Sequence, residues 1–186
     1  QIRLASMLHD VGKIAIPDSI LLKAGPLTQP ETLLMQRHAE IGYHILKDST
    51  SQLMQLASTI AMAHHERFDG GGYPHRFTGS AISVEGRIAA IADVFDALTT
   101  KRVYKPAYSL DRTILILREG NGRHFDPHLL DLFLNSMDQV QEITERFRDR
   151  PAKANRGLQM GAATSSPLNS FPTLAHAHVV SSPHWN

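Results

Sequence analysis

The chain has 186 residues, of which 42% are hydrophobic, and a formal net charge of +1. This length suits about one domain with an apolar core, and the near-neutral charge argues against a large surface for duplex nucleic acid. The chain has no cysteine, which excludes disulfides and zinc sites built from thiolates, and no apolar run is long enough to span a membrane.

Apolar periodicity predicts an all-α fold, with loops and without a convincing run of strands. The first helix is expected from Ile2 to Val11, with a break at Gly12, followed by a loop punctuated by prolines. Thr28 and Glu31 have the spacing of a capping box, so the second helix is expected to begin there and to reach about residue 47. Further helices are predicted over residues 52–66, 84–100 and 110–118.

The last two helices are predicted from different signals. Asp126 has the character of a helix cap, and Pro127 suits the first position of the helix that follows. A final amphipathic helix is indicated by four spaced apolar residues, Met137, Val140, Ile143 and Phe147. We therefore expect one helical domain over residues 1–150.

Both ends of the chain differ from this helical pattern. From Pro151 the residues are mainly Pro, Ala, Ser, Thr and Asn, so residues 151–186 are expected to form a disordered tail. The histidines of this tail are expected to be ordinary residues of a flexible segment. The chain starts with Gln1, and its first residues already have helix-interior character, so we expect a fragment that lacks an N-terminal part.

Four short groups of metal-ligand residues interrupt the apolar helical pattern. They are His9 with Asp10, then His38, then His64 with His65, and finally Asp93. His64 continues an apolar stripe at helical spacing that includes Ile60 and Ala61, so it is expected to face the core. His65 lies about 100° further round the helix, so the two neighbours are expected to serve two different ions.

The other two groups have similar settings. Leu34, Ile41 and Ile45 place His38 at the centre of a stripe that is expected to be buried. Asp93 lies on the flank of the stripe of Ile88, Ile91, Ala92 and Phe95.

Burying several histidines and carboxylates in one small core is costly unless they pair or bind metal. Ligands of this kind, without thiolates, suit iron, manganese or zinc. More than four of them indicate at least two ions, a common arrangement for attack on a phosphate ester. The segment from Asp69 to Pro74 contains three successive glycines, which permit close backbone approach.

Three motifs together resemble the HD-GYP branch of the HD superfamily of metal-dependent phosphohydrolases. The segment LHDVGKI from Leu8 to Ile14 resembles the HD signature, and HHERFDGGGYP from His64 to Pro74 resembles the motif of the branch. The third motif, RIAAIADVFDALTTKR, covers residues 87–102, in the order expected for the branch. The resemblance extends over residues 4–134.

This resemblance implies an HD-domain helical bundle with a loop-mounted GYP motif, and a phosphodiesterase that hydrolyses bacterial cyclic di-GMP to linear pGpG, GMP or both. It implies two or three divalent metal ions, iron or manganese, with Asp10 bridging two of them and a metal-activated water attacking the phosphorus. Lys13 would contact the scissile phosphate. The implied metal ligands are His9, Asp10, His38, His64, His65 and Asp93.

The resemblance also implies a substrate site lined by Gly72, Tyr73, Pro74, Asp96, Arg102 and Lys105. In it, Tyr73 would offer its ring face to guanine and its hydroxyl to phosphate. Arg87 is expected to support the site, and Glu66 and Asp69 are expected to orient ligand histidines.

One departure from the family concerns the segment before His9. Family members usually take a further histidine from an upstream helix, and trinuclear members also take a glutamate. This chain, as given, is therefore expected to have a depleted metal centre and weak catalysis, whereas its full-length parent is expected to be active.

Two other functions remain open from the sequence. The first is a non-catalytic module that binds cyclic di-GMP or partner proteins, and the second is an HD-type hydrolase of another nucleotide. The resemblance further implies diguanylate cyclase or response-regulator partners and a cytoplasmic location.

Overall fold

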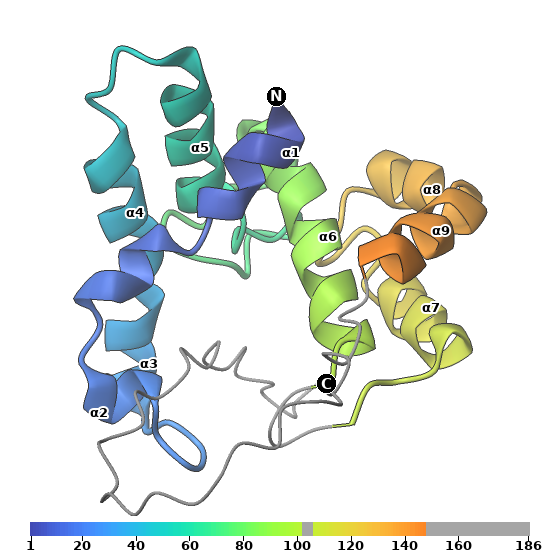
Figure 1. Cartoon of the computed structure of the whole chain (residues 1–186), viewed down its shortest axis with the longest axis horizontal. Coiled ribbons are helices and arrows are strands. Elements are labelled where there is room, and N and C mark those ends of the chain that lie inside the picture. Colours follow the sequence, from blue (N-terminus) through green and yellow to red (C-terminus); the bar gives the residue numbers. More distant parts are fainter. Residues whose placement is uncertain (102–105, 148–186) are drawn as a thin grey trace, which may run out of the picture. The chain divides into compact units, whose positions relative to one another are not determined.

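The computed structural model describes residues 1–101 and 106–147. Within these ranges the protein is helical, with two isolated β-bridges and no strand, so the prediction of an all-α fold is confirmed (Figure 1). The α-helices are α1 (Ile2–Ala5), α2 (Asp18–Leu21), α3 (Gln29–Gln36), α4 (His38–Leu46), α5 (Gln52–Ala63), α6 (Val84–Thr99), α7 (Leu110–Glu119), α8 (Pro127–Asn135) and α9 (Met137–Phe147). Three 3₁₀ helices lie between them, η1 (Ser6–Leu8), η2 (Val11–Ala15) and η3 (Gly79–Ala81).

The described residues divide into two compact units, 1–135 and 136–147. Helix α9 makes up the second unit. The spacing of its apolar residues predicted this amphipathic helix, and the prediction is confirmed. The first unit contains all the other elements. The expected domain boundary at residue 150 and the tail that follows lie outside the described residues, as do Arg102 and Lys105.

The first unit is built around α5. Helix α4 packs against one side of α5, α6 packs against another, and η2 lies on α4 (Figure 1). Helices α7 and α8 pack against α6 and against each other. Ala57, Ile60 and Ala89 are buried in the core between these helices, together with Ala5 and Leu46. This packing places the N-terminal turn, the start of α4 and the end of α5 next to one another.

Three predicted helix boundaries were wrong, and each difference shapes the site. The first predicted helix ends as α1 at Ala5 and continues as 3₁₀ turns, so His9 and Asp10 lie in a turn. The helix predicted to run to residue 47 is divided at Arg37, and His38 opens its second part. Helix α5 ends at Ala63, so both His64 and His65 lie beyond its last residue.

Several local predictions were confirmed. The Glu31 carboxylate accepts hydrogen bonds from the Thr28 N–H at 2.7 Å and from its hydroxyl at 2.9 Å, and these contacts fix the start of α3. Asp126 accepts from the N–H groups of His128 and Leu129 at the start of α8. No helix in residues 1–101 or 106–147 has the length and apolar character needed to cross a membrane.

Candidate metal centre

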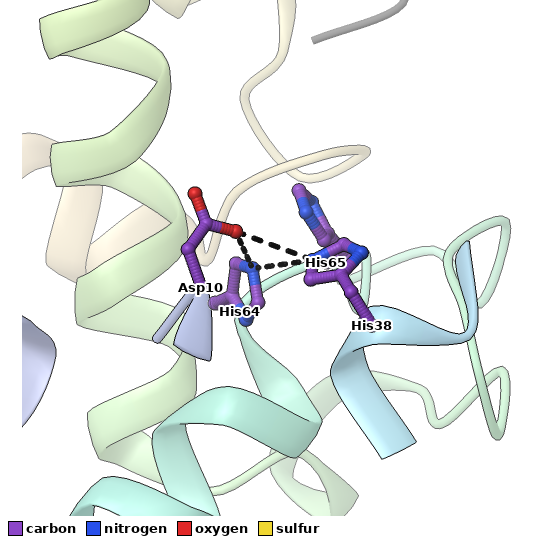
Figure 2. A group of neighbouring side chains, drawn as sticks. All are labelled: Asp10, His38, His64 and His65. Carbon is purple, nitrogen blue, oxygen red and sulfur yellow. Dashed lines mark hydrogen bonds and ion pairs between the residues drawn. The ribbon is translucent and has the colours of Figure 1, made fainter. Parts of the chain in front are cut away.

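A group of imidazoles and one carboxylate meets where η1, η2, α4 and α5 come together. One potential ligand atom from each of Asp10, His38, His64 and His65 lies within 4.8 Å of all the others (Figure 2). This convergence depends on Gly12, where a Cβ would collide with the carbonyl oxygen of His38. The backbone of η2 therefore lies directly against the start of α4, and only glycine permits that approach.

Asp10 lies at the middle of this group. Its Oδ1 is 3.4 Å from Nε2 of His38 and 3.8 Å from Nε2 of His64. Its Oδ2 is 3.3 Å from Nε2 of His9 and 2.6 Å from Nζ of Lys13. His9 Nε2 in turn lies 3.8 Å from a carboxylate oxygen of Asp93. The two oxygens of Asp10 thus face two different sets of nitrogen atoms.

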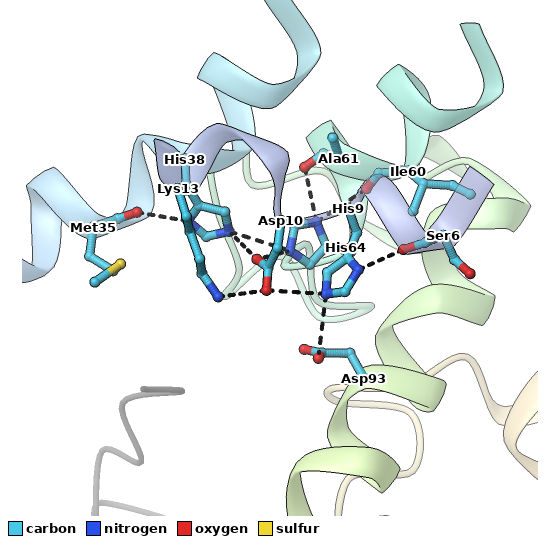
Figure 3. Close-up of polar contacts among 10 residues, drawn as sticks. All are labelled: Ser6, His9, Asp10, Lys13, Met35, His38, Ile60, Ala61, His64 and Asp93. Carbon is cyan, nitrogen blue, oxygen red and sulfur yellow. Dashed lines mark hydrogen bonds and ion pairs between the residues drawn. The ribbon is translucent and has the colours of Figure 1, made fainter. Parts of the chain in front are cut away.

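Three of the imidazoles are anchored in the same way (Figure 3). Nδ1 of His9 lies 2.6 Å from the carbonyl oxygen of Ser6, Nδ1 of His38 lies 2.7 Å from that of Met35, and Nδ1 of His64 lies 2.9 Å from that of Ala61. A carbonyl oxygen only accepts, so each Nδ1 carries the proton and donates it. In the neutral ring, Nε2 then presents a lone pair toward Asp10, which is the usual state of a metal-binding histidine.

Burial keeps the inner imidazoles neutral. It lowers the pKa of His64 to about 3 and also lowers the pKa of His38. The pKa of His65 lies well below its ordinary value, because of burial and then the neighbouring His64 and His38. Nε2 of His38 and Nε2 of His64 are 3.4 Å apart (Figure 2). Two neutral rings anchored through Nδ1 therefore direct two lone pairs toward one another, an arrangement that a shared cation stabilises.

The outer side of the group is charged. Burial opposes protonation of His9, but contact with Asp10, the Ser6 carbonyl and the charge of Asp93 raise its pKa. Burial likewise opposes ionisation of Asp10, but His9 and Lys13 hold the pKa of this carboxyl well below its usual range. Asp10 is therefore an anion at neutral pH, as a metal ligand must be.

The donor set fits divalent metal ions. Oδ1 of Asp10 is buried and accepts no hydrogen bond within the described part of the chain, although it belongs to an ionised carboxylate. A buried charge is normally paired or bound to a metal, and imidazole with carboxylate suits iron, manganese and zinc. The helical phase expected for His64 and His65 was wrong. Both lie beyond the end of α5, so helical phasing does not apply, and each places one ring nitrogen in the same group.

The phase predicted for His38 was also wrong in part. His38 is 1% exposed as expected, but Leu34 and Ile45 are 41% and 51% exposed. The buried residues at helical spacing around His38 are Met35, Ala39, Gly42 and Leu46. His38 is common to both stripes, which is why the conclusion about its burial was right.

The Gly-rich loop comprises residues 69–78 and is closed by a bridge between Asp69 and Thr78. It folds back onto the backbone that follows His64. A Cβ at Gly72 would collide with the backbone of residues 65–67, and the N–H of Tyr73 donates to the carbonyl oxygen of His65 at 3.2 Å. The Tyr73 ring stacks on the His65 ring with centroids 4.7 Å apart and planes 28° apart. The prediction that glycine permits a close approach in this loop is confirmed at Gly72.

Glu66 has a role that the sequence analysis missed. Its carboxylate is 2% exposed and accepts from the N–H of His75 at 2.7 Å and from the N–H of Phe77 at 3.1 Å. The expectation that it would orient a ligand histidine was wrong, because both oxygens hold the loop backbone instead. The available signal was a carboxylate directly after two core-facing histidines and before a loop rich in free N–H groups.

The expectation for Asp69 was wrong for a similar reason. Its carboxylate pairs with Arg67 at 2.8 Å and accepts from the N–H of Gly71 at 2.9 Å, so it also shapes the loop. Segment 120–126 supports the start of this loop from the opposite side. The carbonyl oxygen of Arg123 accepts from the N–H of Asp69, and that of His124 accepts from the N–H of Phe68. Burial lowers the pKa of His124 to about 4, so this segment includes a neutral imidazole at neutral pH.

A cavity of about 440 Å³ lies between the Gly-rich loop and the α3–α4 junction. Its lining includes Gly72, Tyr73 and Pro74 from the loop, and Arg37 and Arg76 supply cationic side chains. Asp96, another expected substrate residue, is exposed on α6, where its carboxylate accepts from the hydroxyl of Thr100 at 3.1 Å. The side chain of Arg87 pairs with Asp126 and donates to the carbonyl oxygen of Ile82.

Comparison with known proteins identifies the class to which this fold and this group of ligands belong. Residues 1–129 match the model of the HD domain family. The chain therefore belongs to the HD superfamily, as the motif at His9 and Asp10 predicts, and its divalent metal chemistry fits that class.

Individual relatives confirm the HD-GYP assignment. Cyclic di-GMP phosphodiesterase response regulator RpfG of Xanthomonas campestris pv. campestris is 47% identical over 152 residues, which cover 82% of this chain and 40% of that protein. A cyclic di-GMP phosphodiesterase of Thermotoga maritima is 39% identical, covering 84% of this chain and 43% of that protein. The 3'3'-cGAMP-specific phosphodiesterase 2 of Vibrio cholerae is 51% identical, covering 80% and 28%. The chain thus spans less than half the length of these relatives.

Proposed function

We propose that this chain is the catalytic domain of a metal-dependent phosphodiesterase that hydrolyses cyclic di-GMP to linear pGpG, GMP or both. The observation that carries the proposal is the carboxylate of Asp10, whose two oxygens face two sets of imidazole nitrogens. Such a carboxylate can bridge two cations, and paired cations are a common device for phosphate ester hydrolysis. Relatives named cyclic di-GMP phosphodiesterases support the substrate.

The proposed ligands fall on the two sides of Asp10. His38, His64 and His65 would hold one ion with Oδ1, and His9 and Asp93 would hold another with Oδ2. We propose iron or manganese, in two or three copies, as the resemblance to the HD-GYP branch implies, and the imidazole and carboxylate donors suit both metals. When bound, these metals lower the pKa of a coordinated water and polarise the phosphate ester.

Other residues of the chain would bind and orient the substrate. Lys13 lies beside Asp10, with its ammonium group 2.6 Å from Oδ2, and would stabilise the negative charge that develops during phosphoryl transfer. Gly72, Tyr73 and Pro74 would line the substrate site, since they border the cavity and the Tyr73 ring stacks on the His65 ring. Burial raises the pKa of Tyr73, so its hydroxyl stays protonated and can donate to a phosphate oxygen. We retain Asp96, Arg102 and Lys105 as proposed substrate contacts.

Metal content and hydrolysis test this proposal together. The protein as its gene encodes it should be purified anaerobically, its iron and manganese counted by inductively coupled plasma mass spectrometry, and cyclic di-GMP turnover followed by chromatography. We expect at least two ions per chain and metal-dependent release of pGpG or GMP. Fewer than two ions together with intact cyclic di-GMP would reject the enzyme and favour a binding module.

The nucleotide preference needs its own experiment, because the relatives include 3'3'-cGAMP-specific phosphodiesterases. Cyclic di-GMP, 3'3'-cGAMP and mononucleotides should be compared by kcat/KM under the same metal loading. We expect the highest value for cyclic di-GMP. A higher value for 3'3'-cGAMP would keep the reaction class and replace the substrate.

The protein partners follow from the same family logic. One relative is named a response regulator, so we propose that a response-regulator or diguanylate cyclase domain acts with this domain, in the cytoplasm. Co-purification of the tagged protein from its own host, with and without the nucleotide, would test both the partner and the location.

A further inference from the structure

His65 differs from the other imidazoles of the metal centre in how its ring is held. Nδ1 of His9, His38 and His64 is fixed by a backbone carbonyl. The ring of His65 makes no hydrogen bond to any residue in the described ranges. Its neighbours are other rings, with centroids 4.0 Å away for His64, 4.7 Å for Tyr73 and 5.0 Å for His38.

Tyr73 contacts His65 through both its backbone and its ring. Its N–H donates to the carbonyl oxygen of His65 at 3.2 Å, and its ring lies nearly parallel to the His65 ring at 28°. The absence of a side chain at Gly72 permits this return of the loop, because a Cβ there would collide with residues 65–67. Glu66 holds the far end of the same loop through the N–H groups of His75 and Phe77.

We propose that Tyr73 is a positioning residue for His65, and that its ring replaces the hydrogen bond that fixes each of the other three histidines. The stack restricts rotation of the imidazole and directs a ring nitrogen toward Asp10 and His38. This inference rests on the proposed metal centre and gives the Gly-rich loop a second role. One face of the Tyr73 ring is already covered by His65, so that face is not available for guanine.

The assignment has a mechanical consequence. The Gly-rich loop borders the cavity on one side and holds a metal-centre histidine on the other. A nucleotide that shifts this loop would shift His65, so substrate binding and metal affinity are coupled. By linkage, a loaded metal centre would change the affinity for nucleotide by the same factor as the nucleotide changes the affinity for metal.

Two substitutions separate the ring of Tyr73 from its hydroxyl. Tyr73→Phe keeps the stack and removes the hydroxyl, whereas Tyr73→Leu keeps apolar volume and removes the stack. Phe77→Leu is the matched control. Phe77 is an aromatic residue of the same loop and is 43% exposed, and its ring lies beside that of His75. Mn²⁺ is the probe, and its affinity and stoichiometry are measured by titration calorimetry and electron paramagnetic resonance without substrate.

We expect Tyr73→Leu to weaken Mn²⁺ binding by about 10-fold to 100-fold, the usual effect of losing a group that orients a ligand. Tyr73→Phe and Phe77→Leu should bind Mn²⁺ as the wild type does. With Mn²⁺ saturating, Tyr73→Phe should alter KM for cyclic di-GMP more than kcat. This combination separates positioning by the ring from substrate contact by the hydroxyl.

Three results would overturn the inference. Wild-type Mn²⁺ affinity in a folded Tyr73→Leu protein removes the positioning role and leaves the proposed function intact. Loss of affinity in Tyr73→Phe also removes it, because this variant keeps the stacked ring, and this result can be obtained even where Tyr73→Leu does not fold. A wild-type protein that binds no Mn²⁺, Fe²⁺ or Zn²⁺ rejects the metal centre, and with it this role.

Discussion

The metal centre around Asp10 and the Gly-rich loop around Glu66 each depend on a carboxylate, which is partly buried in Asp10 and fully buried in Glu66. The two carboxylates are satisfied in opposite ways. Both oxygens of Glu66 accept hydrogen bonds from backbone N–H groups of the loop. Asp10 has one oxygen beside Lys13 and His9, and the other buried among lone pairs of neutral imidazoles without a donor.

Glu66 therefore has a structural role, whereas Asp10 is suited to binding metal ions. Glu66 is complete in the polypeptide itself, so its contribution is to the stability of the loop. For Oδ1 of Asp10, residues 1–101 and 106–147 supply no donor, and leaving an ionised oxygen buried and unpaired costs free energy, so a bound cation would stabilise it. Substitutions of the two residues should therefore fail in different assays.

The largest effect is expected for Asp10→Asn. The amide keeps the shape of the side chain but loses the negative charge that two cations share. We expect loss of at least one ion per chain and a fall in kcat of about 10³-fold, as several kcal/mol of transition-state stabilisation disappear. Metal counting and steady-state kinetics check this, with the exposed Asp18→Asn as control. Full metal content in Asp10→Asn would show that Asp10 is not a shared ligand.

Glu66→Ala should act mainly on stability. It leaves the N–H groups of His75 and Phe77 without their acceptor, and hydrogen bonds to a charged group contribute about 1.5–3 kcal/mol each. We expect the free energy of unfolding to fall by about 3 kcal/mol in a urea titration. The exposed Glu119→Ala should change it little. A loss below about 1 kcal/mol would mean that the loop holds its shape without this carboxylate.

Acid should destabilise the metal-free protein through its buried histidines. Burial lowers the pKa of His64 to about 3 and that of His124 to about 4, below the unfolded value of 6.5. Below pH 6.5 the unfolded chain therefore binds protons that the folded chain does not bind, and stability falls as pH decreases toward 4. Each such histidine contributes a slope of about 1.4 kcal/mol per pH unit.

Urea titrations at several pH values between 7 and 4 would measure that slope. His124→Gln should reduce it, whereas the exposed His128→Gln should leave it unchanged. Equal slopes in the wild type and His124→Gln would indicate that His124 can be protonated in the folded protein.

The smallest effect is expected for Asp69→Asn. Its carboxylate pairs with Arg67 and accepts from Gly71 near the surface of the loop, and the hydrogen bond from Arg67 is the main cause of its lowered pKa. Exposed ion pairs contribute little, so we expect a loss of about 1 kcal/mol or less by thermal or urea unfolding. Metal content should stay at the wild-type level. If the free energy of unfolding fell as much as for Glu66→Ala, the whole loop would depend on the contacts of Asp69.

Some of this organisation could be predicted from the sequence because it depends on short spacings. The stripe through Ile60 and Ala61 correctly predicted that His64 is buried, and His64 is 1% exposed. The stripe through His38 was one residue out of phase, because apolar residues occur on two faces of that segment and periodicity alone does not choose between them. Met35 is 5% exposed, whereas the neighbouring Leu34 is 41% exposed.

Other features depend on tertiary contacts and lack a local signal. Within the described residues, Oδ1 of Asp10 lacks a donor where residues 10, 38 and 64 meet, and the predicted helix is divided at Arg37. The role of Glu66 depends on a loop that returns to residues 65–67. The loop can do so because Gly72 has no side chain to collide with them. Motifs could predict which residues gather, but not which oxygen lacks a partner.

Gly12 has a consequence for how this protein can change over evolutionary time. The backbone of η2 rests against the first turn of α4 at this residue, so the spacing between Asp10 and His38 is set by main chain and not by a compressible side chain. A mutation at position 12 would push the two walls of the centre apart before it changed any ligand. Position 12 is therefore closed to gradual change, because every other residue would move Asp10 relative to His38.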